Sequence, residues 1–425
     1  MNEILSNINP IFIIPLIIII GQIFFRPHIA IYFITFILFV SPVLSEDSGF
    51  TLNRLVGLIA LIGTIYHKVR KNNISIPPAG LHNSFIFLIF LYLLLIGLSV
   101  IANGLYPSTI SYTFDTIVGV VIGWLVLQNI NEDKQIEKIL IGMIVANIIV
   151  AIDFYISVSS YAGLLDTRFL NYTESVNKVS IQLAISIIAI IYLNISKWIN
   201  SFFSFFLKTG PVIILIGAMF LTGSRSAFIC LLVALSFIVF YSKGITFRFK
   251  AISISIFIFI SSFFLFDIIP YSISRIFSVF TFDFNTIQDF DDKRFGLYET
   301  GLKIFFSNPI LGVGFGGYPY NISNYSDWTS KTSPHSLYIG TLSELGLMGF
   351  IVLIIIVYKI LSYLLTFIAY NDNIFCILLI LIIHFVDGFF HGNYIHRQLF
   401  IFIALGIRAS DIIQFRINNG MLSKT

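Results

Sequence analysis

Charged residues are scarce in this chain: Asp, Glu, Lys and Arg together make up 11% of its 425 residues. A soluble domain carries about 25%, so a chain of this composition cannot cover its core with a wetted surface. Cysteine is rarer still, and only Cys230 and Cys376 occur. Both lie inside apolar runs, which excludes a disulfide framework and a cysteine-based metal site. The formal net charge of +4 is too small to indicate a nucleic-acid partner.

Apolar residues take the place of the missing charges. Hydrophobic side chains account for 57% of the chain, and phenylalanine alone occurs 46 times. A membrane-spanning helix needs about 20 mainly apolar residues. Runs of this kind, separated by polar breaks, are residues 10–25, 28–44, 55–66, 85–101, 112–127, 139–158, 179–193, 211–221, 227–241, 251–266, 347–368, 374–390 and 399–407. Because three of them are short, the sequence predicts an all-α integral membrane protein, a polytopic helix bundle of about 11 to 13 transmembrane helices.

Lysine and arginine gather in alternate loops between these runs. The positive-inside rule places such loops in the cytoplasm. The basic groups concerned are Arg26; Lys68, Arg70 and Lys71; Lys134 and Lys138; Lys197 and Lys208; Lys243, Arg248 and Lys250; and Arg408, Arg416 and Lys424. The intervening loops hold few basic residues, so the alternation supports the order of the spans.

One connection is far longer than the others. Residues 267–346 form a stretch without a spanning run, and the topology places it on the external side. Loops longer than about 15 residues are uncommon unless they have a function. Within this one, residues 298–306 predict a short helix that ends at Asn308-Pro309. We find no internal repeat in the sequence, which argues against a transporter built from inverted repeats.

Three basic side chains stand at the predicted outer boundary of the membrane: Arg225, Arg294 and His335. An arginine at the end of a short apolar helix is costly to bury unless it meets an anion or a water-filled cavity. The three residues therefore indicate an externally facing anion site. Ordinary alternatives stay open, namely a boundary arginine that reaches toward water for Arg225, a solvated loop charge for Arg294 and a capping or surface histidine for His335.

Other polar patterns have simpler interpretations. The acidic run Asp289-Phe-Asp-Asp292 resembles a metal-binding motif, but a solvated loop is favoured. The glycine-rich run Gly312–Gly317 lacks the strand and helix of a phosphate-binding loop, which favours a turn at the membrane surface. His384, Asp387 and His391 would suit a proton relay or a metal site. Hydration at the outer surface or helix pairing is favoured for them.

Three segments resemble the O-antigen ligase and polymerase superfamily, whose members are multispanning glycosyltransferases of the bacterial envelope. The first segment is Thr222-Gly-Ser-Arg-Ser, the second runs from Arg294 through Tyr298 to Asn308-Pro-Ile-Leu-Gly-Val-Gly-Phe-Gly, and the third is His335-Ser-Leu-Tyr with Ser343-Glu-Leu-Gly-Leu-Met-Gly. The resemblance is strongest over about residues 211–370. It divides the chain into N-terminal transmembrane helices (1–210), a ligase/polymerase-like core that includes the periplasmic loop 267–346 (211–370), and C-terminal helices with a cytoplasmic tail (371–425). Many members have His-Asn where this chain has His335-Ser336.

The resemblance implies a bacterial inner-membrane enzyme of lipopolysaccharide biosynthesis whose active site faces the periplasm. Such an enzyme moves a glycan from an undecaprenyl diphosphate carrier to an acceptor sugar, without a metal or another cofactor. Arg225 and Arg294 would bind the diphosphate, since the guanidinium fork suits phosphate oxygens. His335 would be the catalytic base or orient the acceptor. Tyr298 and Glu344 would support these groups.

The motifs leave the acceptor open. A polymerase would extend one lipid-linked repeat with another, and this reading is slightly favoured; a ligase would transfer finished polysaccharide to the lipid A-core. The expected partners are the lipid-linked donor, one of these acceptor glycans, the lipid bilayer and a chain-length regulator, with no nucleic acid. A polysaccharide or solute transporter is the alternative of another class, because the hydropathy pattern suits it equally well.

Overall fold

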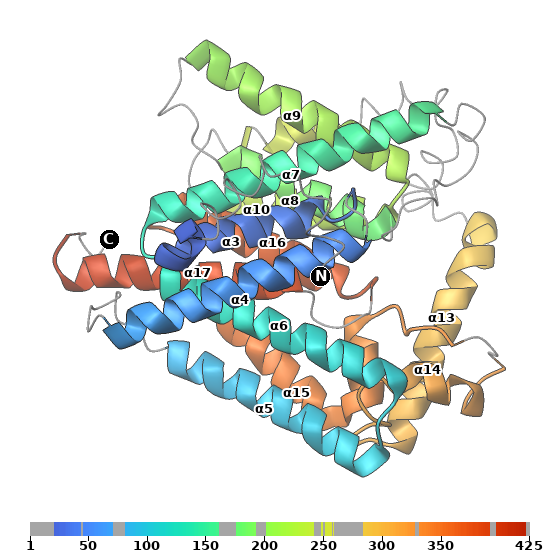
Figure 1. Cartoon of the computed structure of the whole chain (residues 1–425). Helices are drawn as coiled ribbons and strands as arrows, with labels where there is room; N and C mark the ends of the chain where they lie inside the picture. Colours follow the sequence, from blue (N-terminus) through green and yellow to red (C-terminus); the bar gives the residue numbers. More distant parts are fainter. Residues whose placement is uncertain are drawn as a thin grey trace, which may run out of the picture.

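The computed structural model describes residues 21–43, 46–70, 81–160, 176–192, 201–241, 248–249, 251–256, 258, 284–327, 331–391 and 397–421, with the backbone alone at 46–54, 70, 81–83, 158–160, 201–208 and 284–293. This part of the chain folds into helices joined by turns and contains no strand. The helices are α3 (Pro27–Val40), α4 (Glu46–Arg70), α5 (Leu81–Asn103), α6 (Pro107–Asn129), α7 (Asp133–Ser160), α8 (Val176–Tyr192), α9 (Ser201–Thr222), α10 (Arg225–Tyr241), α13 (Phe284–Ser307), α14 (Tyr318–Asn321), the 3₁₀ turn η2 (Ile322–Asn324), α15 (Leu337–Leu365), α16 (Asp372–Asp387) and α17 (Arg397–Asn418) (Figure 1).

The predicted class, an all-α polytopic membrane protein, is confirmed. Among the described residues, five helices are long and apolar enough to cross a membrane, and they belong to α5, α6, α7, α15 and α17. Shorter apolar helices occur in α3, α4, α8, α9 and α10. The total of 11 to 13 spans stays a prediction, because most of run 10–25 and most of run 251–266 lie outside the described residues.

Two helices form the centre of the bundle. Every residue from 179 to 192 in α8 and from 373 to 385 in α16 is buried, as expected for helices that are apolar on all sides. α16 packs against α8, α10 and α17, and α8 also packs against α7 and α9. A second set of contacts pairs α6 with α17, α5 with α15, and α3 with α4 and α7.

The outward faces of the peripheral helices are apolar. On α5, Phe87, Phe90 and Ile101 are 61%, 63% and 83% exposed. Exposed side chains of this kind are compatible with lipid, because acyl chains are as apolar as the side chains themselves. The fold therefore suits a bilayer around its periphery.

Polar contacts join two interhelical connections and the C-terminal part of α17 at one end of the bundle. Asp133, at the start of α7, accepts hydrogen bonds from Asn371 Nδ2 (3.0 Å) and from Arg416 (2.6 Å). Nearby, Arg408 Nε donates to the Ile130 carbonyl at 2.5 Å. These residues come from the α6–α7 link, the α15–α16 link and the last turns of α17. The sequence assigned the basic residues of the α6–α7 link and of the end of α17 to the cytoplasm, and the structure groups these two regions as that topology requires.

The long connection contains more helix than expected. The short helix predicted at 298–306 is part of α13, which begins at Phe284 and ends at Ser307, just before the predicted stop at Asn308. α15 begins at Leu337, ten residues earlier than the span predicted from 347. The expected start coincides instead with a kink at Gly346, whose φ of 65° and ψ of −163° interrupt the helix. A Cβ at Gly346 would lie 2.4 Å from the Ile310 backbone, so glycine is required there.

Candidate functional site

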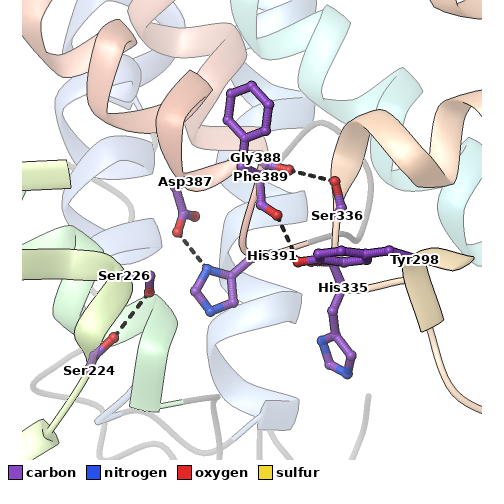
Figure 2. A network of polar contacts seen from close by, with 9 residues as sticks. All are labelled: Ser224, Ser226, Tyr298, His335, Ser336, Asp387, Gly388, Phe389 and His391. Atoms are coloured by element: carbon purple, nitrogen blue, oxygen red, sulfur yellow. Dashed lines mark hydrogen bonds and ion pairs between the residues drawn. The ribbon is translucent and has the colours of Figure 1, made fainter. Parts of the chain in front are cut away.

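The segments with the sequence motifs meet at the end of the bundle opposite Asp133. α16 starts beside Asp133 and ends at Asp387, so the residues that follow it lie at the far end. Figure 2 shows this end, with Ser224 before α10 and Ser226 in its first turn, Tyr298 from α13, His335 and Ser336 before α15, and the segment from Asp387, the last residue of α16, to His391. α10 packs against α16, and α13 against α15. Residues from four separate parts of the sequence thus form one polar region.

Tyr298 joins three of these parts. Its hydroxyl lies 2.9 Å from the Phe389 carbonyl oxygen and 3.3 Å from that of His335 (Figure 2). The hydroxyl donates its hydrogen between these two acceptors. Arg294 lies four residues earlier on α13, on the same face of the helix. The contacts of Tyr298 therefore position the Arg294 turn of α13 against the His335 segment.

Ser336 fixes the start of α15. Its hydroxyl accepts a hydrogen bond from the Ile339 N–H at 3.4 Å, as an N-cap residue does. The same hydroxyl donates to the Gly388 carbonyl at 3.4 Å, and the Leu337 N–H donates to that carbonyl at 2.8 Å. Serine thus has a structural role at the position where many superfamily members have asparagine. Asparagine is an equally good N-cap.

His335 has an unusual backbone conformation. Its φ is 48°, and it is the one non-glycine residue in the described parts of the chain with a positive φ. Such a conformation costs on the order of 1–3 kcal/mol and occurs where the surroundings impose it, often at functional sites. The imidazole is partly exposed, and its pKa is lowered from the ordinary value of 6.5 by burial, by the positive charge of Arg294 and by His391. His335 is therefore neutral at pH 7 and able to accept a hydrogen bond or a proton.

Arg225 is the first residue of α10 and is half-buried. The turn before it is fixed by buried hydroxyls: Thr222 Oγ1 donates to Ser180 Oγ at 3.0 Å and accepts from the Ser224 N–H at 3.3 Å. Gly223 has a φ of 57°, which allows this tight turn. The N-terminus of a helix carries partial positive charge. Arg225 adds to it, so this position favours an anion.

Glu344 holds the glycine-rich run in place. Its carboxylate, in a residue only 2% exposed, accepts hydrogen bonds from the backbone N–H groups of Gly316 (3.0 Å) and Tyr318 (3.1 Å). From the other side, Ser108 Oγ donates to the Gly316 carbonyl at 2.7 Å and Thr109 Oγ1 to the Phe315 carbonyl at 2.5 Å. The glycine-rich run is therefore a turn held between α15 and the start of α6. Because Glu344 occupies two of its N–H groups, these are not available to a phosphate.

The C-terminal end of α16 carries a pair whose geometry the sequence did not predict. His391 Nδ1 lies 2.5 Å from Asp387 Oδ1 (Figure 2). The spacing of four residues was visible in the sequence, but a pattern that also suits a helix surface gives no reason to expect this contact. His384 behaves differently, since it packs inside the bundle with its ring 5.8 Å from that of Phe402. For His384 the expected pairing between helices is therefore the better description.

No three His, Cys, Asp or Glu side chains come together as potential metal ligands in the described parts of the chain. The acidic run Asp289–Asp292 lies in the first half of α13, and its side chains are outside the described residues. The site is thus made of two arginines, two histidines and one nearby carboxylate. Such a set binds an anion and exchanges a proton with a neighbouring hydroxyl.

Residues 210–354 match the family model described as O-antigen ligase. The match contains Arg225, Arg294, Tyr298, His335 and Glu344, and it ends before Asp387 and His391. Among curated proteins, none matches the chain.

Proposed function

We propose, from the match of residues 210–354 to the O-antigen ligase family model, that the chain is a member of the O-antigen ligase and polymerase superfamily and transfers a glycan from an undecaprenyl diphosphate carrier to an acceptor sugar. The reaction would take place at the periplasmic face of the bacterial inner membrane. We further propose that the acceptor is a second lipid-linked glycan, so that the enzyme is an O-antigen or surface polysaccharide polymerase.

One observation carries the proposal. The hydroxyl of Tyr298 links the helix that carries Arg294 to the backbone of His335. The positive charge of Arg294 contributes to the lowered pKa of His335. The α9–α10 turn that begins with Thr222 and continues to Arg225 lies at the same end of the bundle. A cationic site beside a neutral imidazole suits a reaction in which a diphosphate leaves and a hydroxyl attacks.

The proposed chemistry is a displacement at the anomeric carbon of the donor sugar. The acceptor oxygen forms a bond to that carbon, while the bond from the carbon to the diphosphate oxygen breaks and its electron pair leaves with the diphosphate. The hydroxyl proton passes to a base at the site. Arg225 and Arg294 bind the diphosphate through paired N–H donors and stabilise the negative charge that develops on it. No covalent enzyme intermediate and no metal is required by this scheme.

The alternative acceptor is the lipid A-core, and the name of the matching family, O-antigen ligase, favours it. A bacterial strain that lacks this protein distinguishes a polymerase from a ligase. Loss of a polymerase leaves single repeats on the core in a gel of envelope lipopolysaccharide, whereas loss of a ligase leaves bare core and carrier-linked polymer in the membrane. An unchanged ladder would contradict both activities and favour a transporter.

A further inference from the structure

Asp387 and His391 form a pair that the turn after α16 holds rigidly. Asp387 is the last residue of the helix, and its carbonyl accepts hydrogen bonds from the N–H groups of Phe390 (2.8 Å) and His391 (2.9 Å). The His391 side chain then reaches back to the Asp387 carboxylate at 2.5 Å. The side chains of His391 and Asp387 are 14% and 11% exposed. Both backbone and side chain therefore fix the imidazole relative to the carboxylate.

This contact determines which imidazole nitrogen can accept a proton. An ionised carboxylate only accepts hydrogen bonds, so the nitrogen that faces it, Nδ1, carries the hydrogen of the neutral ring. The lone pair then lies on Nε2. That atom is fully buried, and no described residue offers it a hydrogen bond. A buried polar atom without a partner is costly in a native protein and calls for an explanation. A substrate hydroxyl would supply the missing donor.

The Asp387–His391 pair lies next to the site of the proposed function. His391 is close enough to His335 for its charge to affect that residue. The turn between Asp387 and His391 also supplies the two carbonyls that anchor the site, since Phe389 accepts from the Tyr298 hydroxyl and Gly388 from Ser336. In Figure 2, His391 lies on the side of Tyr298 that faces the Ser224–Ser226 turn. His391 thus stands among the segments that carry Arg225, Arg294 and His335.

We infer that His391 is the catalytic base, which accepts the proton of the acceptor hydroxyl on Nε2, and that Asp387 positions it. As the acceptor oxygen bonds to the anomeric carbon and the diphosphate departs with the electron pair, the proton moves to Nε2. The Asp387 carboxylate stabilises the imidazolium that results, and water removes the proton afterwards. His335 then orients the acceptor rather than deprotonating it. This inference rests on the proposed function.

Two substitutions of His391 separate its proton-accepting role from its structural contact. His391→Asn places an amide N–H near the position of Nδ1, so it retains the bond to Asp387 but has no Nε2. His391→Gln places an amide near Nε2 and loses the bond. The assay uses purified protein in nanodiscs, with lipid-linked oligosaccharide extracted from the deletion strain as donor and that strain's core lipopolysaccharide as the alternative acceptor. Binding of undecaprenyl diphosphate alone is measured in parallel.

We expect His391→Asn to lower kcat about 100-fold or more at pH 7, with the KM for the donor and the binding of undecaprenyl diphosphate unchanged. The rate of this variant should rise with pH, because hydroxide then replaces the missing base. Asp387→Asn should lower kcat with little change in KM, and Asp387→Glu should restore part of the loss. Partial rescue by a carboxylate separates a positioning role from a purely structural one.

Several outcomes would overturn the inference. A kcat of His391→Asn within threefold of wild type would do so, as would an equal loss of rate and of undecaprenyl diphosphate binding. If His391→Asn does not accumulate in the membrane, the kcat and the undecaprenyl diphosphate binding of His391→Gln are judged in the same way. A normal kcat of Asp387→Asn would contradict the positioning role of Asp387. A wild-type protein that transfers glycan to neither acceptor contradicts the proposed function, and the base with it. Active wild type with active His391→Asn contradicts the base alone.

Discussion

The Tyr298 hydroxyl lies 2.9 Å from the carbonyl oxygen of Phe389, a residue 91 positions away in the sequence. This contact connects α13, which belongs to the long segment predicted to be external, to the turn that ends α16, a helix at the centre of the bundle whose residues 373–385 are all buried. α13 is also held by packing against α15 and by the Tyr318 hydroxyl, which donates to the Leu297 carbonyl at 2.7 Å. The hydrogen bonds of Tyr298 add a direct link between the Arg294 turn and the backbone of His335 and Phe389.

Replacing Tyr298 by Phe tests this relationship. The change removes the hydroxyl and leaves the ring, so the protein should insert normally. Each hydrogen bond contributes about 0.5–1.5 kcal/mol, and their loss should lower kcat/KM for glycan transfer about tenfold, since about 1.4 kcal/mol corresponds to a factor of ten. Transfer is measured with lipid-linked donor in nanodiscs. Tyr358→Phe is the matched control, because Tyr358 lies on α15 and is 69% exposed. Equal activity of both variants would show that Tyr298 does not position the site.

Lysine substitution tests whether the two arginines act through more than their positive charge. Arg225→Lys and Arg294→Lys keep the charge but lose the planar pair of N–H donors that binds two phosphate oxygens at once. We expect each variant to lower transfer by a factor of about 10–100, which is less than the roughly 100–1000-fold loss on removing a preorganised donor to a developing anion, because lysine keeps the charge. The amount of protein in the membrane should stay the same. Arg26→Lys, at the predicted cytoplasmic end, serves as the control and should be fully active. Normal transfer by both site variants would disprove the diphosphate clamp.

The general fold could be predicted because apolar runs and basic loops are local signals. The α13 helix and its end at Asn308-Pro309 were also recognisable, since proline disfavours helix at the residue before it. The start of α15 was misplaced by ten residues because its first turns, Leu337 to Gly346, contain Gly340, Ser343 and Glu344. These residues lower the local hydropathy although the segment is helical and largely buried.

The geometry of the site depended on contacts that no local pattern encodes. Glu344 lies within a sequence motif and was predicted to support Arg225, Arg294 and His335; its carboxylate accepts hydrogen bonds from a backbone turn 26 to 28 residues earlier. The Asp387–His391 pair was visible as a spacing, but only the turn after α16 brings the side chains into contact. The sequence therefore indicated segments that lie together in the structure, but it did not indicate which groups these side chains touch.

Glu344→Gln should affect stability more than chemistry. The carboxylate accepts two backbone N–H groups in a buried position, and an amide can accept only one of them while its own NH₂ faces the other. An unsatisfied buried N–H costs about 1–3 kcal/mol. We expect a lower melting temperature in detergent and a smaller folded yield, with near-normal kcat per folded molecule. Glu299→Gln is the control, because that carboxylate is 67% exposed in its pair with Lys303. A kcat that collapses at unchanged stability would instead assign Glu344 to the reaction.

The ionisation of His335 should be visible in the pH dependence of stability. Its pKa in the folded protein is below the ordinary value of 6.5, mainly through burial and then through the charge of Arg294. Below pH 6.5 the unfolded chain therefore binds more protons at this residue than the folded chain does, and stability falls as the pH is lowered toward the folded pKa. His335→Asn removes the titrating group, and asparagine tolerates the positive φ. We expect the melting temperature of the wild type, relative to that of the variant, to drop as the pH falls below about 6.5 and to stay constant above about pH 7. A constant difference across the whole range would show that His335 titrates normally, and an opposite slope would show that an anionic neighbour, rather than Arg294, dominates its surroundings.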